Sequence, residues 1–418
     1  MADLTRRALL MRAGLAAGTL ALAGSETTEA APDLRKWSDV RAQFDLDPRR
    51  IHLASFVFAS HPRPVRRAIE LHRRGLDADP FGYLHAHEGP LTNRVREAAA
   101  QHLGVPSAEI ALTDSTTMAL GLLYTRLRLR PADEVLTTEH DFYATHEALR
   151  LSGAQVRRTR LYDDPQRASV DEIVARLRRA ISKRTRVVAL TWVHSSTGVR
   201  LPIRAIRDAL PDRIILCVDG VHGLGAVATT LGSLGCDAFA AGCHKWLYGP
   251  RGTGVLWAND RVRELLPPAI PSFDDPESYG AWLGGYTPTG TADGARLTPG
   301  GYHSFEHRWA LADAFAFQHA IGRRRVEARI RTLATRLKRG LADTPRVRLR
   351  TPVQGDLSAG IVCFERDGTD PQTAVTRLLT KRIVASTTPY RPSYVRLGPG
   401  IVNSVADIDA AVRAVAAL

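Results

Sequence analysis

Seven short apolar runs alternate with helical stretches over most of the middle of this chain. The runs are rich in β-branched residues and lie at residues 110–112, 134–137, 155–158, 187–192, 214–218, 238–241 and 254–257. Runs that are apolar on both faces and linked by helices are typical of a mainly parallel sheet covered by helices on both sides. This alternation restricts the possible architectures more than any other feature, and it predicts an α/β fold.

The sequence changes character on either side of this region. Residues 51–58 predict a short extended segment, stopped by His61-Pro62-Arg63-Pro64 before a helix over about 65–76. A Gly/Pro/Asp-rich loop at about 267–301 precedes one long predicted helix over about 305–341. Strands at 347–351, 359–365 and 395–397, with helices near 371–381 and 406–416, then predict a smaller α+β domain.

The length of 418 residues and the apolar content of 44% suit two or three domains that share large cores. We predict an N-terminal segment at 31–64, a large domain at 65–300 and a small C-terminal domain at 301–418.

The first thirty residues form a separate segment. Thr5-Arg6-Arg7-Ala8-Leu9-Leu10 is followed by a weakly apolar stretch at 13–24 and a polar, small-residue part that ends near Ala30-Ala31-Pro32. This pattern predicts a twin-arginine export signal at 1–30 and a periplasmic or extracellular location. The apolar stretch is too short for a stable membrane anchor. An amphipathic N-terminal helix is the alternative interpretation.

The net charge of +14 raises the question of a polyanionic partner. Arginine is spread along the whole chain, and the densest basic run, at 323–339 and including Lys338, fits a solvated helix face without interleaved aromatic residues. We therefore expect no nucleic-acid partner, and an exported polyanion-binding protein remains a rival class.

Cysteine and histidine usage argues against disulfides and metal. The four cysteines, Cys217, Cys236, Cys243 and Cys363, are too few and too scattered for a disulfide framework and are expected to be buried thiols. His85-Ala86-His87-Glu88 and the group His303, Glu306 and His307 lack a complete set at metal-ligand spacing. We expect no metal.

Lys245 has the clearest chemical setting in the chain. The other four lysines, at 36, 183, 338 and 381, each adjoin an arginine, as surface lysines commonly do. Lys245 instead lies in Gly242-Cys243-His244-Lys245-Trp246-Leu247-Tyr248-Gly249-Pro250-Arg251-Gly252, between an apolar run and a Gly/Pro turn. Desolvation there would lower the pKa of its amine and favour Schiff-base chemistry. An ordinary lysine at a strand end is the alternative.

Asp219 is a second candidate site residue that accompanies Lys245 in the sequence. It ends the apolar run Ile215-Leu216-Cys217-Val218-Asp219, at the carboxyl end of a predicted buried strand, where α/β sheets bind their ligands. A desolvated carboxylate needs a cationic partner, and a protonated pyridine nitrogen is one.

The combination of Asp219, His222 and His244-Lys245 followed by Gly-Pro-x-Gly resembles the class V aminotransferases. These are fold type I enzymes that use pyridoxal 5'-phosphate and include cysteine desulfurases, kynureninases and isopenicillin N epimerases. The resemblance covers nearly all of the chain after residue 30. It implies that Lys245 carries the cofactor covalently and that Asp219 faces the ring nitrogen, with His222 and His244 beside the cofactor.

The resemblance also implies roles for residues elsewhere. Thr116 and Thr117, in Asp114-Ser115-Thr116-Thr117, would hold the cofactor phosphate at a helix amino terminus, where a plain helix cap is the alternative. His140 would cover the pyridine face, with Phe142 or Tyr143 in its place if the register slips. Ser195 would contact the phenolic oxygen, and its identity is closer to the epimerase branch than to the desulfurases. Arg396, in Tyr394-Val395-Arg396-Leu397-Gly398-Pro399-Gly400, would grip the substrate α-carboxylate.

Two departures from the family pattern matter. Gly242 stands where many relatives have a phosphate-binding serine, so one contact must come from elsewhere, and Gly300-Gly301-Tyr302-His303-Ser304-Phe305 is a candidate from across a dimer interface. The stretch 385–392 before Arg396 contains no cysteine, whereas desulfurases carry their nucleophile there. We therefore expect that the protein is not a cysteine desulfurase.

The expected function is that of a homodimeric enzyme acting at the α-carbon of a small-molecule or peptide-linked amino acid. Transamination, epimerisation, β- or γ-elimination and decarboxylation remain open, because they differ only in which bond stands perpendicular to the ring. The export signal resembles that of periplasmic enzymes of this family that mature pyoverdine siderophores, with oxidative loss of a carboxylate.

Overall fold

The computed structural model describes residues 32–418, and the predicted export signal at 1–30 lies outside the described residues. Its main feature is a seven-stranded sheet with the order β2-β8-β7-β6-β5-β3-β4. The strands are β2 (Ile110–Thr113), β3 (Glu134–Thr138), β4 (Gln155–Thr159), β5 (Thr185–Thr191), β6 (Ile215–Asp219), β7 (Ala238–Gly242) and β8 (Gly254–Ala258). Only β8 runs antiparallel to its neighbours. The predicted mainly parallel sheet is therefore confirmed.

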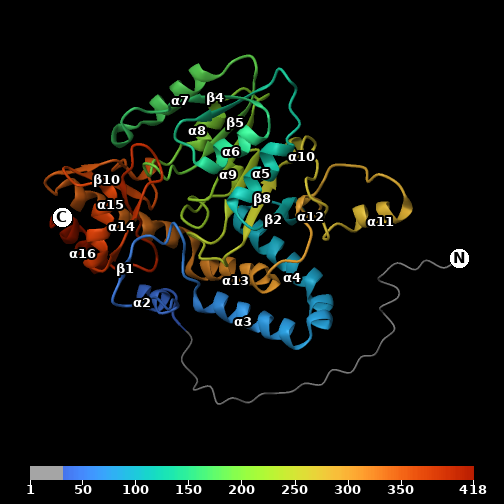
Figure 1. Ribbon diagram of the computed structural model, residues 1–418, viewed down its shortest axis with the longest axis horizontal. Coiled ribbons are helices and arrows are strands. Elements are labelled where there is room, and N and C mark those ends of the chain that lie inside the picture. Colours follow the sequence, from blue (N-terminus) through green and yellow to red (C-terminus); the bar gives the residue numbers. More distant parts are fainter. Residues whose placement is uncertain (1–31) are drawn as a thin grey trace. The chain divides into compact units, whose positions relative to one another are not determined.

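Both faces of this sheet are apolar, as the continuous runs predicted. In β5, Val187 and Ala189 pack into one buried cluster, and Val188 and Leu190 pack into the cluster on the other face. The first cluster includes residues of α5 (Thr116–Arg126) and α6 (Tyr143–Leu151). The second includes residues of α3 (Arg63–Ala78), α4 (Pro80–Leu103), α7 (Val170–Ala180), α8 (Ile203–Ala209), α9 (Leu231–Leu234) and α13 (Phe305–Ile321). The sheet is thus covered by helices on both faces (Figure 1).

The C-terminal part has its own sheet and core. Four antiparallel strands have the order β12-β13-β10-β9, with bounds β9 (Val347–Leu349), β10 (Val362–Arg366), β12 (Ser386–Thr387) and β13 (Val395–Leu397). The helices α14 (Arg323–Ala342), α15 (Pro371–Thr380) and α16 (Val405–Ala416) pack on them around a separate apolar cluster. This is the predicted smaller α+β part, shown in orange and red in Figure 1.

The N-terminal segment is joined to the C-terminal part. Its strand β1 (Ile51–His52) pairs in parallel with β11 (Ile383–Val384), and the amide of Gly398 donates to the carbonyl of Leu53. The extended segment predicted at 51–58 is therefore a strand for two residues only, because turns follow it. The domain boundaries at residues 64 and 300 stay predictions.

The remaining elements connect these parts. They are α2 (Trp37–Arg41), α10 (Asp260–Arg263), α11 (Pro276–Gly284), α12 (Gly294–Leu297) and the short 3-10 helices η1 (Ser107–Glu109), η2 (Pro165–Arg167) and η3 (Gly355–Leu357). Across residues 32–418, no helix is both long and apolar enough to cross a membrane.

The single long helix predicted at 305–341 is wrong. Gly322 has a φ of 95° and ends α13, and α14 starts at the next residue. This conformation is readily adopted only by glycine, so the chain turns there. As a result α13 packs on α3 and α4, whereas α14 packs on α16 (Figure 1).

The surface setting predicted for Lys338 is also wrong. Its side chain is 1% exposed on the buried side of α14. The Nζ atom donates to the carbonyl oxygens of Pro352 (2.8 Å) and Val353 (3.0 Å) and to Oγ of Ser358 (2.6 Å). Lysine is rarely buried unless its ammonium is satisfied, and here three neutral oxygens satisfy it.

Candidate active site

The predicted site residues gather at one edge of the large sheet. Strands β2, β3, β5, β6 and β7 run in the same direction, and each ends at a predicted residue or within four residues before one. Those residues are Thr116 after β2, His140 after β3, Ser195 after β5, Asp219 at the end of β6, and His244 and Lys245 after β7. Carboxyl ends of parallel strands are where α/β folds bind ligands, so the topology places side chains 129 positions apart at one site.

The half-buried Lys245 and the buried Asp219 attract each other electrostatically at this edge. Asp219 is 2% exposed, and burial raises the pKa of its carboxyl to about 6 although Lys245 and the amide of Val221 oppose the rise. Burial lowers the pKa of the Lys245 amine to about 8, against the attraction of Asp219. Among the described residues, the amide of Val221 supplies the one hydrogen bond to the carboxylate, at 3.0 Å. Asp219 is thus desolvated and still able to accept a cationic donor.

His222 and His244 flank this pair. His222 is buried, and the indole Nε1 of Trp246 donates to its Nδ1 at 3.4 Å. Burial holds the pKa of both imidazoles below the ordinary value, with Lys245 adding to the effect, so both rings are neutral near pH 7. Neutral imidazoles beside Lys245 do not compete with its amine for Asp219.

Thr116 and Gly242 bring two strand ends together at the amino terminus of α5. The amide of Gly242 donates to Oγ1 of Thr116 at 2.7 Å, and Ser115 caps the helix through a 3.1 Å bond from the amide of Met118. Thr116 is buried, whereas Thr117 is exposed. The helix amino terminus and the Thr116 hydroxyl form a small cradle of the kind that binds phosphate.

The segment predicted to supply the lost phosphate contact lies beside this cradle in the same chain. Nδ1 of His303 is 3.6 Å from the carboxylate of Asp114, and a guanidinium nitrogen of Arg308 is 3.9 Å from it. Asp114 directly precedes the cap residue of α5. His303 therefore lies beside the amino terminus of α5 without the help of a second chain.

His140 stacks on an aromatic ring that the sequence analysis missed. Its imidazole lies 4.0 Å from the ring of Tyr162 with an interplanar angle of 10°. The Tyr162 hydroxyl is bonded to Nδ1 of His194 and Oγ1 of Thr197, each at 2.8 Å. Burial lowers the pKa of both His140 and His194 to about 3, so both imidazoles are neutral. Phe142 and Tyr143, the alternatives to His140 for covering the pyridine face, fit less well. Tyr143 is 69% exposed, and Phe142 packs near Tyr390.

Ser195 joins the large sheet to the small one. Its Oγ lies 2.9 Å from the hydroxyl of Tyr390, and its carbonyl accepts from Nη1 of Arg396 at 3.2 Å. Arg396 also donates from Nε to Ser386 Oγ at 3.2 Å and lies over the ring of Phe56. Over the described chain, no carboxylate is paired with the guanidinium of Arg396, a residue that is 7% exposed. A buried cation without an acid is suited to a carboxylate ligand.

Asp141 is a structural anchor that the sequence reading also missed. It is 1% exposed and accepts hydrogen bonds from Thr137 Oγ1, the amide and Oγ1 of Thr138, and the amide of Thr191, at 2.6 to 2.8 Å. It ties β3 to β5 and so fixes the loop that carries His140. The Thr-Thr-x-x-Asp spacing at 137–141 is the signal that could have revealed it, because these side chains cap a strand end.

The histidine groups considered as metal ligands do not assemble. His307 lies 3.4 Å from Glu306, and His87 is bonded to the carbonyl of Tyr83. Over residues 32–418, no group of three His, Cys, Asp or Glu side chains is arranged to hold a metal ion.

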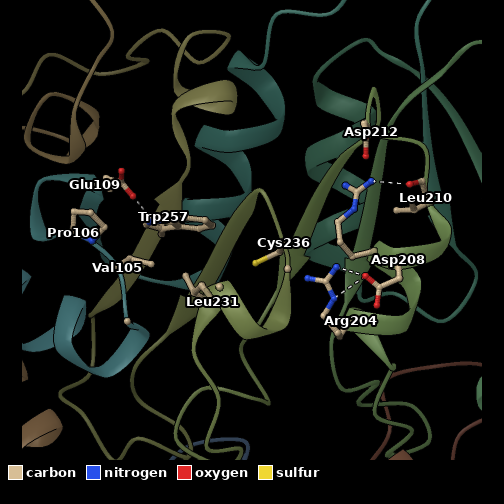
Figure 2. Close-up of a pocket in the computed structure, with 14 residues that line it drawn as sticks. Val105, Pro106, Glu109, Arg204, Asp208, Leu210, Asp212, Leu231, Cys236 and Trp257 are labelled. Carbon is tan, nitrogen blue, oxygen red and sulfur yellow. Dashed lines mark hydrogen bonds and ion pairs between the residues drawn. The ribbon is translucent and has the colours of Figure 1, made fainter.

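An open groove of about 590 Å³ lies at the opposite, amino-terminal edge of the sheet (Figure 2). Its arginines are already paired: Arg204 with Asp208, and Arg207 with Asp237 and three carbonyl oxygens. Trp257 donates to Glu109 there at 2.8 Å. The groove shares none of the residues described above.

Comparison with known proteins agrees with this geometry. The family model described as aminotransferase class V matches residues 82–389. Isopenicillin N epimerase of Streptomyces clavuligerus is 30% identical over 80% of this chain and 85% of its own, and a probable cysteine desulfurase of Vibrio cholerae is 25% identical over 87% and 92%. A solved C-DES variant with glycine covalently linked to its PLP cofactor has a TM-score of 0.82 at 22% identity, covering 90% of this chain and 98% of that one.

The fold and the donor set together define a fold type I pyridoxal-phosphate enzyme. A helix amino terminus, a desolvated acid and an amine of lowered pKa all lie at one sheet edge. The chain belongs to the aminotransferase class V family. The predicted family, fold class and cofactor are confirmed.

Proposed function

We propose that this protein acts at the α-carbon of an amino acid or amino-acid-like group, with Lys245 holding pyridoxal 5'-phosphate. The observation that carries the proposal is that three groups lie at one site: the half-buried Lys245, whose amine has a lowered pKa, the buried carboxylate of Asp219, and the buried Arg396, whose guanidinium is paired with no carboxylate among the described residues. These three groups match the aldehyde, the ring nitrogen and the substrate carboxylate.

Lys245 acts as nucleophile and proton carrier. Because its pKa is lowered to about 8, a useful fraction of its Nζ is unprotonated near neutral pH and can attack the cofactor aldehyde. With the substrate bound, the same Nζ would accept the proton from the α-carbon and return it.

Asp219 fixes the electronic character of the site. Its carboxylate would accept a hydrogen bond from the protonated ring nitrogen. The bound cofactor would then supply an electron sink for the bond broken at the α-carbon. His140 covers one face of the ring, and Thr116 and Thr117 at the amino terminus of α5 bind the phosphate, with His222 and His244 beside it. Ser195 is the proposed contact to the phenolic oxygen.

Arg396 orients the substrate by its carboxylate. The guanidinium has two bonds to the protein, from Nε and from Nη1, which leaves Nη2 and the second proton of Nη1 for a ligand. This fork suits a carboxylate bound end-on.

The absence of a reactive thiol supports chemistry other than desulfuration. No cysteine lies at 385–392, and all four cysteines are buried. Cys363, opposite Arg396 in the β10–β13 pair, is fully buried, and burial raises the pKa of its thiol to about 12. A thiol that stays protonated is a poor nucleophile.

Epimerisation is the reaction best supported among those left open, because two isopenicillin N epimerases are each 30% identical over 80% of this chain. Transamination and oxidative decarboxylation, as in siderophore or other secondary-metabolite maturation, remain alternatives, as does a β- or γ-lyase. We further propose export through the Arg6-Arg7 signal and a homodimer, for which the exposed aromatic residues Phe273, Tyr279, Trp282, Tyr286 and Tyr302 provide an apolar surface.

The test is an absorbance spectrum of the purified protein before and after borohydride, with Lys245→Ala as the control. A visible band that borohydride removes, with a mass increment on Lys245, is expected. A colourless protein that gains no band from added cofactor contradicts the proposal. Product analysis with amino acids and glutamyl-terminated peptides then separates inversion, keto acid formation, oxygen uptake and release of sulfide.

A further inference from the structure

Tyr390 is held at the site by the small sheet. It lies in the turn between β12 and β13, two short strands that pair through Ser386 with Arg396 and Thr387 with Val395. Three further bonds close the turn: Thr388 amide to Tyr394 carbonyl, Tyr394 amide to Thr388 Oγ1, and Ser393 Oγ to Thr388 carbonyl, at 2.7 to 2.9 Å. The turn that carries Tyr390 is therefore tied to the strand that carries Arg396.

The Tyr390 hydroxyl and the Arg396 guanidinium are both fixed by one residue. Ser195 Oγ is 2.9 Å from the Tyr390 hydroxyl, while the Ser195 carbonyl accepts from Arg396 Nη1. The ring of Phe142 lies edge-on to Tyr390, with centroids 6.1 Å apart. The Tyr390 hydroxyl and the Arg396 guanidinium, both from the small sheet, therefore contact the large sheet at the same residue, Ser195.

The chemistry of the phenol decides what it can do there. Burial raises the pKa of the Tyr390 hydroxyl well above its ordinary value, so it stays protonated at neutral pH. Either hydroxyl can donate in the bond between Ser195 and Tyr390, and when Ser195 donates, the Tyr390 proton is free for a ligand. Two of the five guanidinium N–H groups of Arg396 are already bonded to the protein. A carboxylate bound by the other three N–H groups still has lone pairs without a hydrogen-bond donor.

We propose that Tyr390 is a substrate-binding residue that donates a hydrogen bond to the carboxylate held by Arg396, with Ser195 orienting its hydroxyl. This inference rests on the proposed function of Arg396. The stretch at 385–392 thus presents a phenol to the substrate where desulfurases present a thiol, and Tyr390 favours a ligand with an α-carboxylate over one without it.

The experiment measures dissociation constants of the holoenzyme for glycine and for glycinamide, which lacks the carboxylate, by absorbance titration. Tyr390→Phe keeps the ring and removes the hydroxyl. It is expected to weaken glycine binding roughly 10- to 100-fold, as for a lost hydrogen bond to a charged group, and to leave glycinamide binding unchanged.

Tyr394→Phe is the matched control, since Tyr394 lies on the same turn with its ring against Arg350. It is expected to change neither constant. Thermal unfolding of each variant checks that the fold is intact.

Equal weakening of both ligands by Tyr390→Phe, or no change for glycine, would overturn the role of Tyr390. Arg396→Lys separates this result from the proposed function. If it weakens glycine and Tyr390→Phe does not, only the Tyr390 proposal fails. If Arg396→Lys leaves glycine binding unchanged, the carboxylate site itself is misassigned and both fail.

Discussion

Oγ1 of Thr116 lies 2.7 Å from the backbone nitrogen of Gly242, which donates to it, so the start of α5 is bonded to the end of β7. A Cβ at position 242 would lie 2.9 Å from the same oxygen and 3.0 Å from Cε1 of His244. The missing serine of the family pattern is thus explained by the structure, because the Thr116 hydroxyl occupies the space that a side chain at 242 would need.

Gly242→Ser is therefore expected to weaken the cofactor site rather than restore a phosphate contact. Thr116 or His244 must shift, at a cost of roughly 1–3 kcal/mol typical of overpacking. The dissociation constant for pyridoxal phosphate, measured by absorbance titration of cofactor-free protein, checks this. Thr116→Ser keeps the hydroxyl and serves as the control. Tighter binding in Gly242→Ser would show that the cradle has room for the serine.

The pH dependence of cofactor uptake should follow the Lys245 amine. Its pKa is lowered to about 8, and only the neutral amine attacks an aldehyde. The association rate should rise with pH through a midpoint near pH 8 and level off above it. Because the Asp219 carboxylate raises the pKa of Lys245, Asp219→Asn should move the midpoint to lower pH. Stopped-flow absorbance at a series of pH values measures both, and a midpoint near the ordinary value of 10.5 would refute the desolvated setting.

Asp141→Asn should destabilise the fold although Asp141 does not belong to the predicted site. The carboxylate accepts from two amides and two hydroxyls, and an amide nitrogen in place of one oxygen would face a donor. Leaving a buried donor unpaired costs about 1–3 kcal/mol. Urea unfolding measures the loss. Asp212→Asn, at an exposed position, is the control and should leave the free energy of unfolding unchanged.

Lys338 should make stability depend on pH in alkaline solution. Its pKa is about 8 in the folded protein, lowered by burial from 10.5. Between these values the unfolded chain holds a proton that the folded chain lacks, so stability rises with pH. The slope is about 1.4 kcal/mol per pH unit for one proton. Lys338→Met should remove this slope in urea unfolding at a series of pH values. A variant with the same slope as the parent would show that Lys338 keeps its proton when folded.

The local sequence determined the centre of the predicted site, Asp219 and Lys245, by its own chemistry, whereas the roles of the other predicted residues came from the family resemblance. The apolar runs predicted β5, β6 and β7. Asp219 and Lys245 stood out because removing a charged side chain from water at a strand end costs free energy unless a partner compensates for it. The parallel direction of those strands then forces their carboxyl ends to one edge, so the grouping could be predicted without coordinates.

Tertiary structure alone decided the rest. Tyr162 and Tyr390 had no local signal, since their contacts with His140 and Ser195 join residues 22 and 195 positions apart. Lys338 followed a surface-like pattern and became buried because the carbonyls of Pro352 and Val353 meet its amine from a distant loop. The physical reason is the same in each case. Periodicity and charge report on a residue's own element, whereas burial and hydrogen bonding depend on what another part of the chain brings to it.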